Sequence, residues 1–129
     1  MINIYYNTKN HGFYRTIEWL EYHQISYNIK PILQLTREDF LKILSLTDNG
    51  FEDLFSVRKV HKQAFDIYTM NQLIDYILEN PKMLKAPIAF NEKHLLIGYD
   101  AGEIRVFLSR NHRKEELKLT KNRIKFENT

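Results

Sequence analysis

The chain has 129 residues with a hydrophobic fraction of 43% and an aromatic fraction of 13%, which is enough to bury a core within one domain. Its formal net charge of +3 is small for this hydrophobicity, so an intrinsically disordered chain is excluded. The sequence has no cysteine, which excludes disulfides and thiolate metal sites. No apolar run approaches the ~20 residues of a membrane span, and no signal-peptide pattern is present, so we expect a cytoplasmic protein.

The first third of the chain predicts a strand, a helix and a second strand. Residues 2–6 alternate apolar and β-prone side chains, and residues 25–30 form a second short run of this kind. Between them, a polar loop over 7–12 precedes residues 13–23, whose apolar side chains recur at helical spacing. Two strands joined through one helix are expected to lie parallel and adjacent in the same sheet.

The middle of the chain predicts a series of helices. Thr36 can cap the first of them. This helix is expected to end at Asp48-Asn49-Gly50, where glycine takes a left-handed conformation without a steric clash. Residues 51–66 are predicted to form one or two short helices. A capping-box pattern that starts at Thr69 predicts a further helix, which ends near Asn80.

The last third predicts a hairpin, a short helix and a tail. The runs at 87–90 and 94–98 are expected to pair as antiparallel strands, and Asp100 can cap a helix over about 103–108. This order of elements is typical of an α/β, thioredoxin-like fold with a mixed four-stranded sheet. We expect one domain with three parts: a core of about residues 1–33 and 81–110, a helical insertion of about 34–80, and a basic tail of 111–129.

Basic residues are concentrated towards the C-terminal end of the chain. Residues 105–129 hold eight basic and three acidic side chains, a balance of +5, which leaves −2 for the rest of the chain. A basic end of this kind can bind nucleic acid or an acidic protein surface. It is also compatible with a tail that is merely solvated, so both interpretations stay open.

Several short motifs follow one another along the chain. They are Trp19-Leu20-Glu21-x-His23-x-Ile25, Leu46-Thr47-x-x-Gly50, Leu84-Lys85-x-Pro87-Ile88, Gly98-Tyr99 and Glu103-Ile104-Arg105-x-Phe107-Leu108. As an ordered set, they make residues 2–110 similar to the Spx branch of the arsenate-reductase-like (ArsC-like) family. This resemblance implies the thioredoxin-like fold of that family, with a cis bond before Pro87. It also implies a transcription regulator that binds the C-terminal domain of the RNA polymerase α subunit.

The chain departs from this family where thiol chemistry is expected. Asn10 and Phe13 stand at the positions of the two switch cysteines of Spx, and Asn10 also stands at that of the reductases' catalytic cysteine. A thiolate is the nucleophile in this chemistry, and asparagine cannot replace it. Ala86 further replaces an arginine that the reductases use around their oxyanion. We therefore expect no catalytic residue, no cofactor, and a regulator that does not respond to thiol oxidation.

The resemblance implies a partner-binding site around Gly50. In Spx the matching glycine lies in the polymerase contact surface, where the absence of a side chain permits close approach. Asn49 and Phe51 flank this glycine in the present chain. The same glycine could also serve only as the C-terminal stop of the preceding helix. The sequence leaves both roles open.

A short basic cluster follows this position. Arg58, Lys59 and Lys62 are candidates for contacts with DNA phosphates, which lysine and arginine neutralise without reading the bases. Promoter DNA would be contacted only within the polymerase complex. A solvated helix face, or a structural ion pair of Arg58, also explains the cluster.

Two alternatives to a polymerase-binding activator remain. One is an orphan thioredoxin-like enzyme or oxyanion-binding protein that uses Asn10, His11 and Arg58 on an oxyanion or a glutathione-like substrate. It requires an open pocket that converges on Arg58, whereas in a docking protein Phe13 is expected to fill that pocket. The other alternative is a decoy that occupies the polymerase without activating it. No pair of histidines has the spacing of metal ligands, so no metal site is expected.

Overall fold

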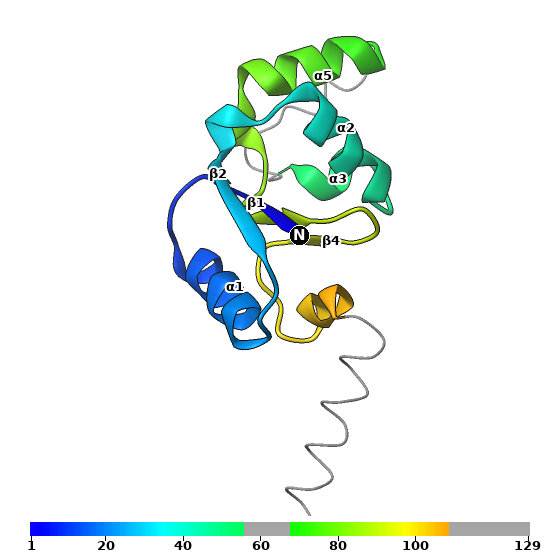
Figure 1. The fold of residues 1–129 in the computed structure, drawn as a ribbon. Coiled ribbons are helices and arrows are strands. Elements are labelled where there is room, and N and C mark those ends of the chain that lie inside the picture. The colour runs from blue at the N-terminus through cyan, green and yellow to red at the C-terminus, as the bar shows by residue number, and fades with distance from the viewer. Residues whose placement is uncertain (56–67, 109–129) are drawn as a thin grey trace, which may run out of the picture.

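A mixed four-stranded β-sheet forms the centre of the molecule, with helices on both faces (Figure 1). The computed structural model describes residues 1–55 and 68–108. The sheet has the order β2-β1-β3-β4, and β1 pairs in parallel with β2 but antiparallel with β3, which pairs antiparallel with β4. The predicted mixed sheet, the parallel strand pair and the C-terminal hairpin are confirmed. The strands are β1 (Ile2–Tyr6), β2 (Tyr27–Pro31), β3 (Ile88–Phe90) and β4 (Leu95–Ile97).

Helices connect these strands. Helix α1 (His11–Tyr22) joins β1 to β2, and the short 3-10 helix η3 (Glu103–Phe107) follows β4. The described residues between β2 and β3 contain η1 (Ile32–Gln34), α2 (Arg37–Leu46), α3 (Phe51–Leu54), α5 (Met70–Glu79) and η2 (Pro81–Met83). No helix in the described ranges is long and apolar enough to cross a membrane. The Ala86–Pro87 peptide bond is cis, as the family resemblance implies.

Two predicted boundaries shift for reasons that the hydrogen bonds explain. The polar loop expected over 7–12 is shorter, because Asn10 caps α1 and the helix already begins at His11. Strand β2 begins at Tyr27 rather than at residue 25, because the chain is still completing the turn after α1. In that turn Gln24 has a φ of 55°, and the Ile25 N–H donates to the Leu20 carbonyl oxygen at 2.9 Å.

The predicted end of α2 is wrong. The helix stops at Leu46, and the Thr47 hydroxyl donates to the Leu44 carbonyl oxygen at 2.7 Å. Gly50, expected to close this helix, instead precedes α3 as its N-cap residue. The expected helix over 103–108 is also a 3-10 helix rather than an α-helix. Of the one or two helices predicted over 51–66, α3 is one, and residues 56–66 lie outside the described part of the chain.

The two faces of the sheet bury separate apolar cores, because side chains alternate along each strand. Helices α1 and η3 cover the first face, and the helices between β2 and β3 cover the second (Figure 1). The first core contains Ile2, Ile4, Leu20, Ala89, Leu96, Ile104 and Phe107. The second contains, among others, Tyr5, Phe40, Ile43, Leu54, Ile74, Ile77, Ile88 and Phe90.

Helix α5 shows how local sequence sets an element of the second core. The Gln72 N–H donates to the Thr69 hydroxyl at 3.3 Å, and the Thr69 N–H donates to the Gln72 side-chain oxygen at 2.9 Å. This reciprocal pair is the predicted capping box, which satisfies N–H groups that the first turn leaves without helical partners. Downstream, Leu73, Ile74 and Ile77 share the buried face.

Tyr5 ties the sheet to the helices of the second face. Its side chain is 1% exposed and stacks on Phe90 with ring centroids 6.3 Å apart. Its hydroxyl donates a hydrogen bond to a carboxylate oxygen of Asp39 in the first turn of α2. The Asp39 N–H in turn donates to the Thr36 hydroxyl at 3.1 Å. Burial, followed by the hydrogen bond and charge of Asp39, raises the pKa of the Tyr5 hydroxyl above its ordinary value of 10.

We predict that the raised pKa of Tyr5 makes the fold sensitive to alkaline pH. The neutral phenol is favoured in the folded state, so its contribution is complete below the unfolded pKa of 10 and falls as the pH rises above it. Relative to Tyr5→Phe, the wild-type protein should lose up to about 1.4 kcal/mol of unfolding free energy per pH unit in that range. Urea unfolding of both proteins between pH 8 and about pH 11 measures this difference.

A matched Tyr22→Phe variant serves as the control, because Tyr22 is 79% exposed. Its pH profile should follow that of the wild type. Parallel profiles for the wild type and Tyr5→Phe would show that the buried hydroxyl does not couple folding to pH.

Candidate functional site

A tight turn at residues 48–50 lies between α2 and α3. Gly50 has a φ of 69°, in the left-handed region that residues with a Cβ atom rarely adopt. A Cβ atom built on Gly50 would meet no atom within 4 Å. The glycine is therefore required by the backbone conformation and not by crowding inside the protein. Its open side leaves room for another surface to approach the backbone closely.

The carboxylate of Asp53 holds this turn in place. One carboxylate oxygen accepts the backbone N–H groups of Asp48 at 3.1 Å and Asn49 at 2.9 Å, and the other accepts the Asn49 side-chain amide at 3.2 Å. The backbone and side-chain bonds from Asn49, with smaller contributions from Asp48 and Lys85, lower the pKa of Asp53. These hydrogen bonds restrict the turn to one shape.

Sequence reasoning missed Asp53, although a local signal was present. Asp53 lies three positions after the N-cap residue Gly50, where an acidic side chain can reach back to free N–H groups at the helix start. The expected helix end at Gly50 concealed this relation, because it placed the glycine at the wrong end of a helix.

A shallow cleft of about 400 Å³ borders the 48–50 turn. Leu46, Leu95 and Ile97 contribute apolar groups to it. The acidic side chains of Asp48, Glu52, Asp53 and Glu103 also line the cleft, and Lys85 is the single basic one among the residues that line it. A partner with a basic surface would match this charge.

The three residues predicted to bind the partner differ in their exposure to solvent. Asn49 is exposed and Gly50 is half-buried at the surface of the turn. Phe51 is half-buried, and its ring lies 6.3 Å from that of Phe40 and 6.2 Å from that of Phe55. Phe51 therefore anchors α3 on the second core, which leaves Asn49 and Gly50 as the outward part of the predicted site.

Asn10 and Phe13, which the family resemblance places at the switch-cysteine positions, both have structural roles. The Asn10 side-chain oxygen accepts the Phe13 N–H at 2.9 Å and caps α1. An anion bound at this helix start would use such N–H groups, so Asn10 takes a position that an oxyanion would need. The Phe13 side chain is 3% exposed and packs against Tyr6 at 5.0 Å and Tyr14 at 5.3 Å between ring centroids.

The remaining candidate residues are not brought together by the described structure. On the exposed surface of α1, the Arg15 side chain donates to the His11 ring nitrogen at 3.2 Å. Arg58, Lys59 and Lys62 lie outside the described residues. Within residues 1–55 and 68–108, no group of three His, Cys, Asp or Glu side chains is arranged to hold a metal ion.

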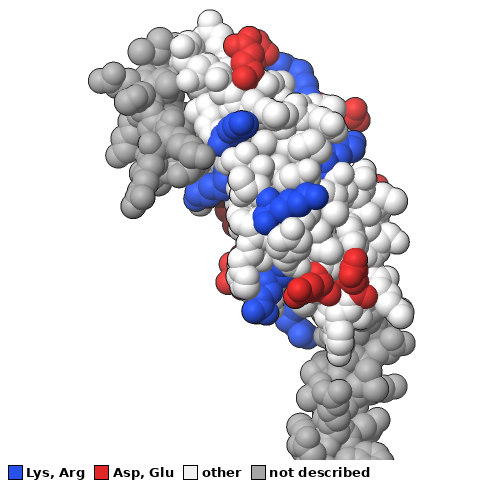
Figure 2. Space-filling model, turned by 90° about the vertical axis from the view of Figure 1, so that its left-hand side faces the viewer, with Lys and Arg blue, Asp and Glu red and all other residues white. Residues whose placement is uncertain are grey.

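The charge on one face is mixed. Figure 2 shows lysine and arginine side chains of the described residues scattered singly over this face, with acidic side chains between them. A DNA-binding face needs a continuous row of basic groups along the phosphates. The described residues of the face in view provide no such row.

A family comparison agrees with these features. Residues 6–107 match the model of the ArsC family. The chain belongs to this family. Its described fold, a mixed sheet with helices on both faces, is the ArsC, thioredoxin-like fold, and its lack of cysteine sets it apart from thiol-dependent chemistry.

Curated relatives are transcriptional regulators by name. The Global transcriptional regulator Spx of Streptococcus pyogenes serotype M1 is 40% identical over 106 residues, which cover 78% of this chain and 79% of the relative. The protein of the same name from Streptococcus agalactiae serotype V is also 40% identical, over 78% of this chain and 77% of the relative.

Solved structures share the fold at low identity. An arsenate reductase from Vibrio cholerae has a TM-score of 0.56 and 16% identity, covering 81% of this chain and 92% of that one. An arsenate reductase (ArsC) related protein from Brucella melitensis has a TM-score of 0.55 and 19% identity, covering 82% and 92%. At these identities the likeness establishes the fold alone.

We predict that Asn10 contributes to stability as a helix cap. Asn10→Ala should lower the free energy of unfolding by about 1 kcal/mol, because the Phe13 N–H loses its acceptor, whereas Asn10→Asp should keep nearly full stability. Thermal or urea unfolding of the three proteins checks this. Equal stability of Asn10→Ala and the wild type would mean that the cap contributes nothing.

Proposed function

We propose that this protein regulates transcription by docking on the C-terminal domain of the RNA polymerase α subunit, and that docking does not depend on thiol oxidation. The observation that carries the proposal is the open backbone at Gly50. Relatives also support the proposal. The Spx proteins that are 40% identical to this chain are named global transcriptional regulators.

The geometry of the 48–50 turn suits a close contact. A glycine with a φ of 69° and free space beside it lets a partner's surface meet the main chain directly. The bonds to Asp53 keep the turn in one shape. The acidic side chains along the adjoining cleft favour a basic partner and disfavour an acidic one. Asn49 and Gly50 are thus proposed as the contact residues, with Phe51 as their anchor.

The former active-site loop supports a docking protein over an enzyme. A buried Phe13 is the side chain expected to fill the pocket of a docking protein. Asn10 caps α1 with its own amide oxygen, so an oxyanion would have to displace that bond. Because the chain has no thiol, it cannot form the covalent or disulfide intermediates of thiol chemistry.

We infer that residues 1–129 form one ArsC-like domain. A thioredoxin-like core of about 1–33 and 81–110 carries the helical insertion of about 34–80, and the insertion carries the docking turn. Arg58, Lys59 and Lys62 would contact promoter phosphates only after the polymerase has brought DNA close. Transcription reactions with purified polymerase separate an activator from a decoy, since a decoy binds without raising transcript yield.

We predict that Gly50→Arg abolishes docking. Gly50→Ala and Gly50→Arg should each cost about 1 kcal/mol of stability, because both place a Cβ atom at a positive φ. Only the arginine should weaken binding to the α C-terminal domain, by at least about 100-fold, because its side chain separates the two surfaces. Calorimetric titration, after thermal unfolding confirms a folded variant, measures both effects.

Gly98 offers a matched control for this substitution. It has a φ of 74° and no atom within 4 Å of an added Cβ, so Gly98→Arg introduces the same backbone strain at a residue that is not among those lining the cleft beside the 48–50 turn. It should retain wild-type docking. Wild-type affinity of Gly50→Arg, or equal loss in both arginine variants, would remove Gly50 from the interface.

We further predict that docking is unchanged by thiol oxidants. Diamide acts on thiols, and this chain offers none. Its oxidisable sulfur atoms belong to Met1, Met70 and Met83, which form sulfoxides by a different reaction. The dissociation constant for the α C-terminal domain should be the same before and after diamide treatment of the regulator alone. A diamide-dependent change would contradict this prediction.

A further inference from the structure

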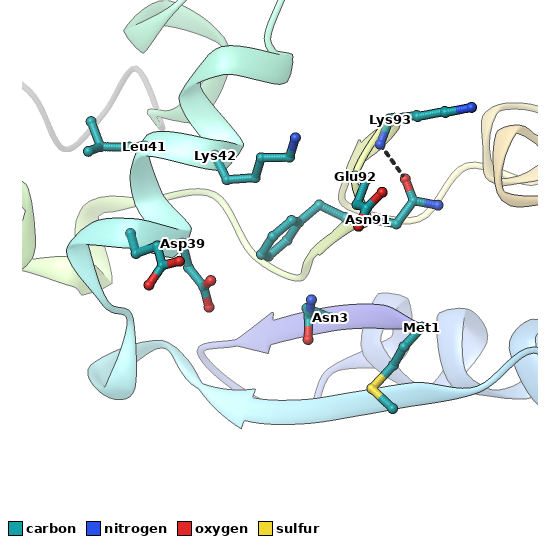
Figure 3. Close-up of a pocket in the computed structure, with 10 residues that line it drawn as sticks. Met1, Asn3, Asp39, Leu41, Lys42, Asn91, Glu92 and Lys93 are labelled. Atoms are coloured by element: carbon teal, nitrogen blue, oxygen red, sulfur yellow. Dashed lines mark hydrogen bonds between the residues drawn. The ribbon is translucent and has the colours of Figure 1, made fainter.

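A second, larger cleft lies between α2 and the turn that joins β3 to β4 (Figure 3). Its volume is about 910 Å³, which is within the range of sites for small organic molecules. The first two turns of α2 form one wall and the β3–β4 turn forms the other. Asn3 of β1 and Phe90 of β3 also line the cleft. These segments are far apart in the sequence and meet only in the fold.

Both walls carry charges of both signs. Helix α2 contributes Glu38, Asp39 and Lys42, and the β3–β4 turn contributes Glu92 and Lys93. The carboxylates therefore outnumber the lysines by one, and negative and positive side chains both line the cleft. Leu41 lines the same cleft and is 43% exposed, so it offers an apolar contact beside the charged groups.

The polar groups differ in how they are engaged. Asp39 is fixed by the Tyr5 hydroxyl and by its own N–H bond to Thr36. Lys42 is half-buried and extends across the cleft toward the β3–β4 turn (Figure 3). Within the described residues, no hydrogen bond or ion pair engages the Lys42 ammonium or the half-buried Asn3 side-chain amide. Both groups can therefore donate hydrogen bonds to a polar ligand.

The charges exclude several classes of ligand. A simple anion would meet the carboxylates of Glu38, Asp39 and Glu92, and a polyanion such as DNA would be repelled more strongly. A bare metal ion lacks a cluster of three ligands in the described part of the chain. A molecule that carries both an ammonium and a carboxylate can satisfy both signs at once.

We propose that this cleft binds a small zwitterion of the amino-acid or short-peptide class. Its ammonium group lies at Asp39 and its carboxylate at Lys42, and in a peptide the amide group lies at Asn3. Asp39 and Lys42 are three residues apart on α2 and so face the same side of the helix. The proposal does not depend on polymerase docking, because binding to this cleft is measured without the polymerase.

The test uses the full chain and the dipeptide Ala-Leu, whose leucine side chain can contact Leu41. Exposed ion pairs are weak, so we expect a dissociation constant on the order of 1 mM. N-acetyl-Ala-Leu removes the ammonium charge, and Ala-Leu amide removes the carboxylate. Each should bind about fivefold more weakly than the free dipeptide. Amide chemical shifts of α2 and the β3–β4 turn, followed by NMR titration, report the affinity and its place.

Substitution of Lys42 tests whether this lysine is the group that binds the carboxylate of the peptide. Lys42→Gln should weaken Ala-Leu about fivefold and leave Ala-Leu amide unchanged, because that peptide has no carboxylate to lose. Lys30→Gln is the matched control, since Lys30 is a half-buried lysine on β2 that does not line this cleft. It should alter neither peptide. The proposal is overturned if Ala-Leu causes no shifts at about 10 mM, if the capped peptides bind as well as the free one, or if Lys42→Gln weakens all peptides alike.

Discussion

The hydrogen bond from the buried Tyr5 hydroxyl to the Asp39 carboxylate joins the central sheet to helix α2. Tyr5 belongs to the first strand, at the centre of the sheet, and Asp39 belongs to the first turn of α2. A hydrogen bond to an ionised acceptor is stronger than one between neutral groups, and loss of one partner would leave a polar group buried. Together with the buried side chains of Phe40 and Ile43, this bond holds α2 against the sheet. Both proposed binding surfaces lie beside this helix.

The two surfaces lie toward opposite ends of α2. The mixed-charge cleft lies along the first turns of the helix, and the 48–50 turn follows its last residue. Because a packed helix moves as a rigid element, its position sets the place of both surfaces relative to the sheet. Asp53 then fixes the local shape of the turn, independently of α2.

Asn10 and Phe13 both contribute to the folded state at the start of helix α1. A residue at a helix start has to satisfy free N–H groups, and Asn10 does so with its side-chain oxygen. The Phe13 side chain faces inward and adds buried apolar area. Both residues therefore favour the folded state, and neither side chain can carry out thiol chemistry.

Local patterns were sufficient for the elements whose causes lie within a few residues. The alternation of residues 2–6, the capping box at Thr69 and the need for a left-handed glycine at Gly50 were all readable from neighbouring side chains. Neighbouring residues did not reveal which helix Gly50 belongs to. The choice between ending α2 and beginning α3 depends on where the Asp53 carboxylate lies. Asn10 is itself a local signal for a helix start, because asparagine is a preferred N-cap residue.

The sequence by itself determined the strands, most helices, the lack of thiol chemistry and, through its ordered motifs, the family. The tertiary structure alone decided that Tyr5 meets Asp39, that Phe13 is buried among other rings, and that Asn3, Lys42 and Glu92 line one cleft. The physical reason is the distance along the sequence over which each kind of interaction acts. Hydrogen bonds within a turn and side-chain periodicity act between near neighbours, whereas contacts between distant segments exist only once the sheet order and the packing of α2 have placed them together.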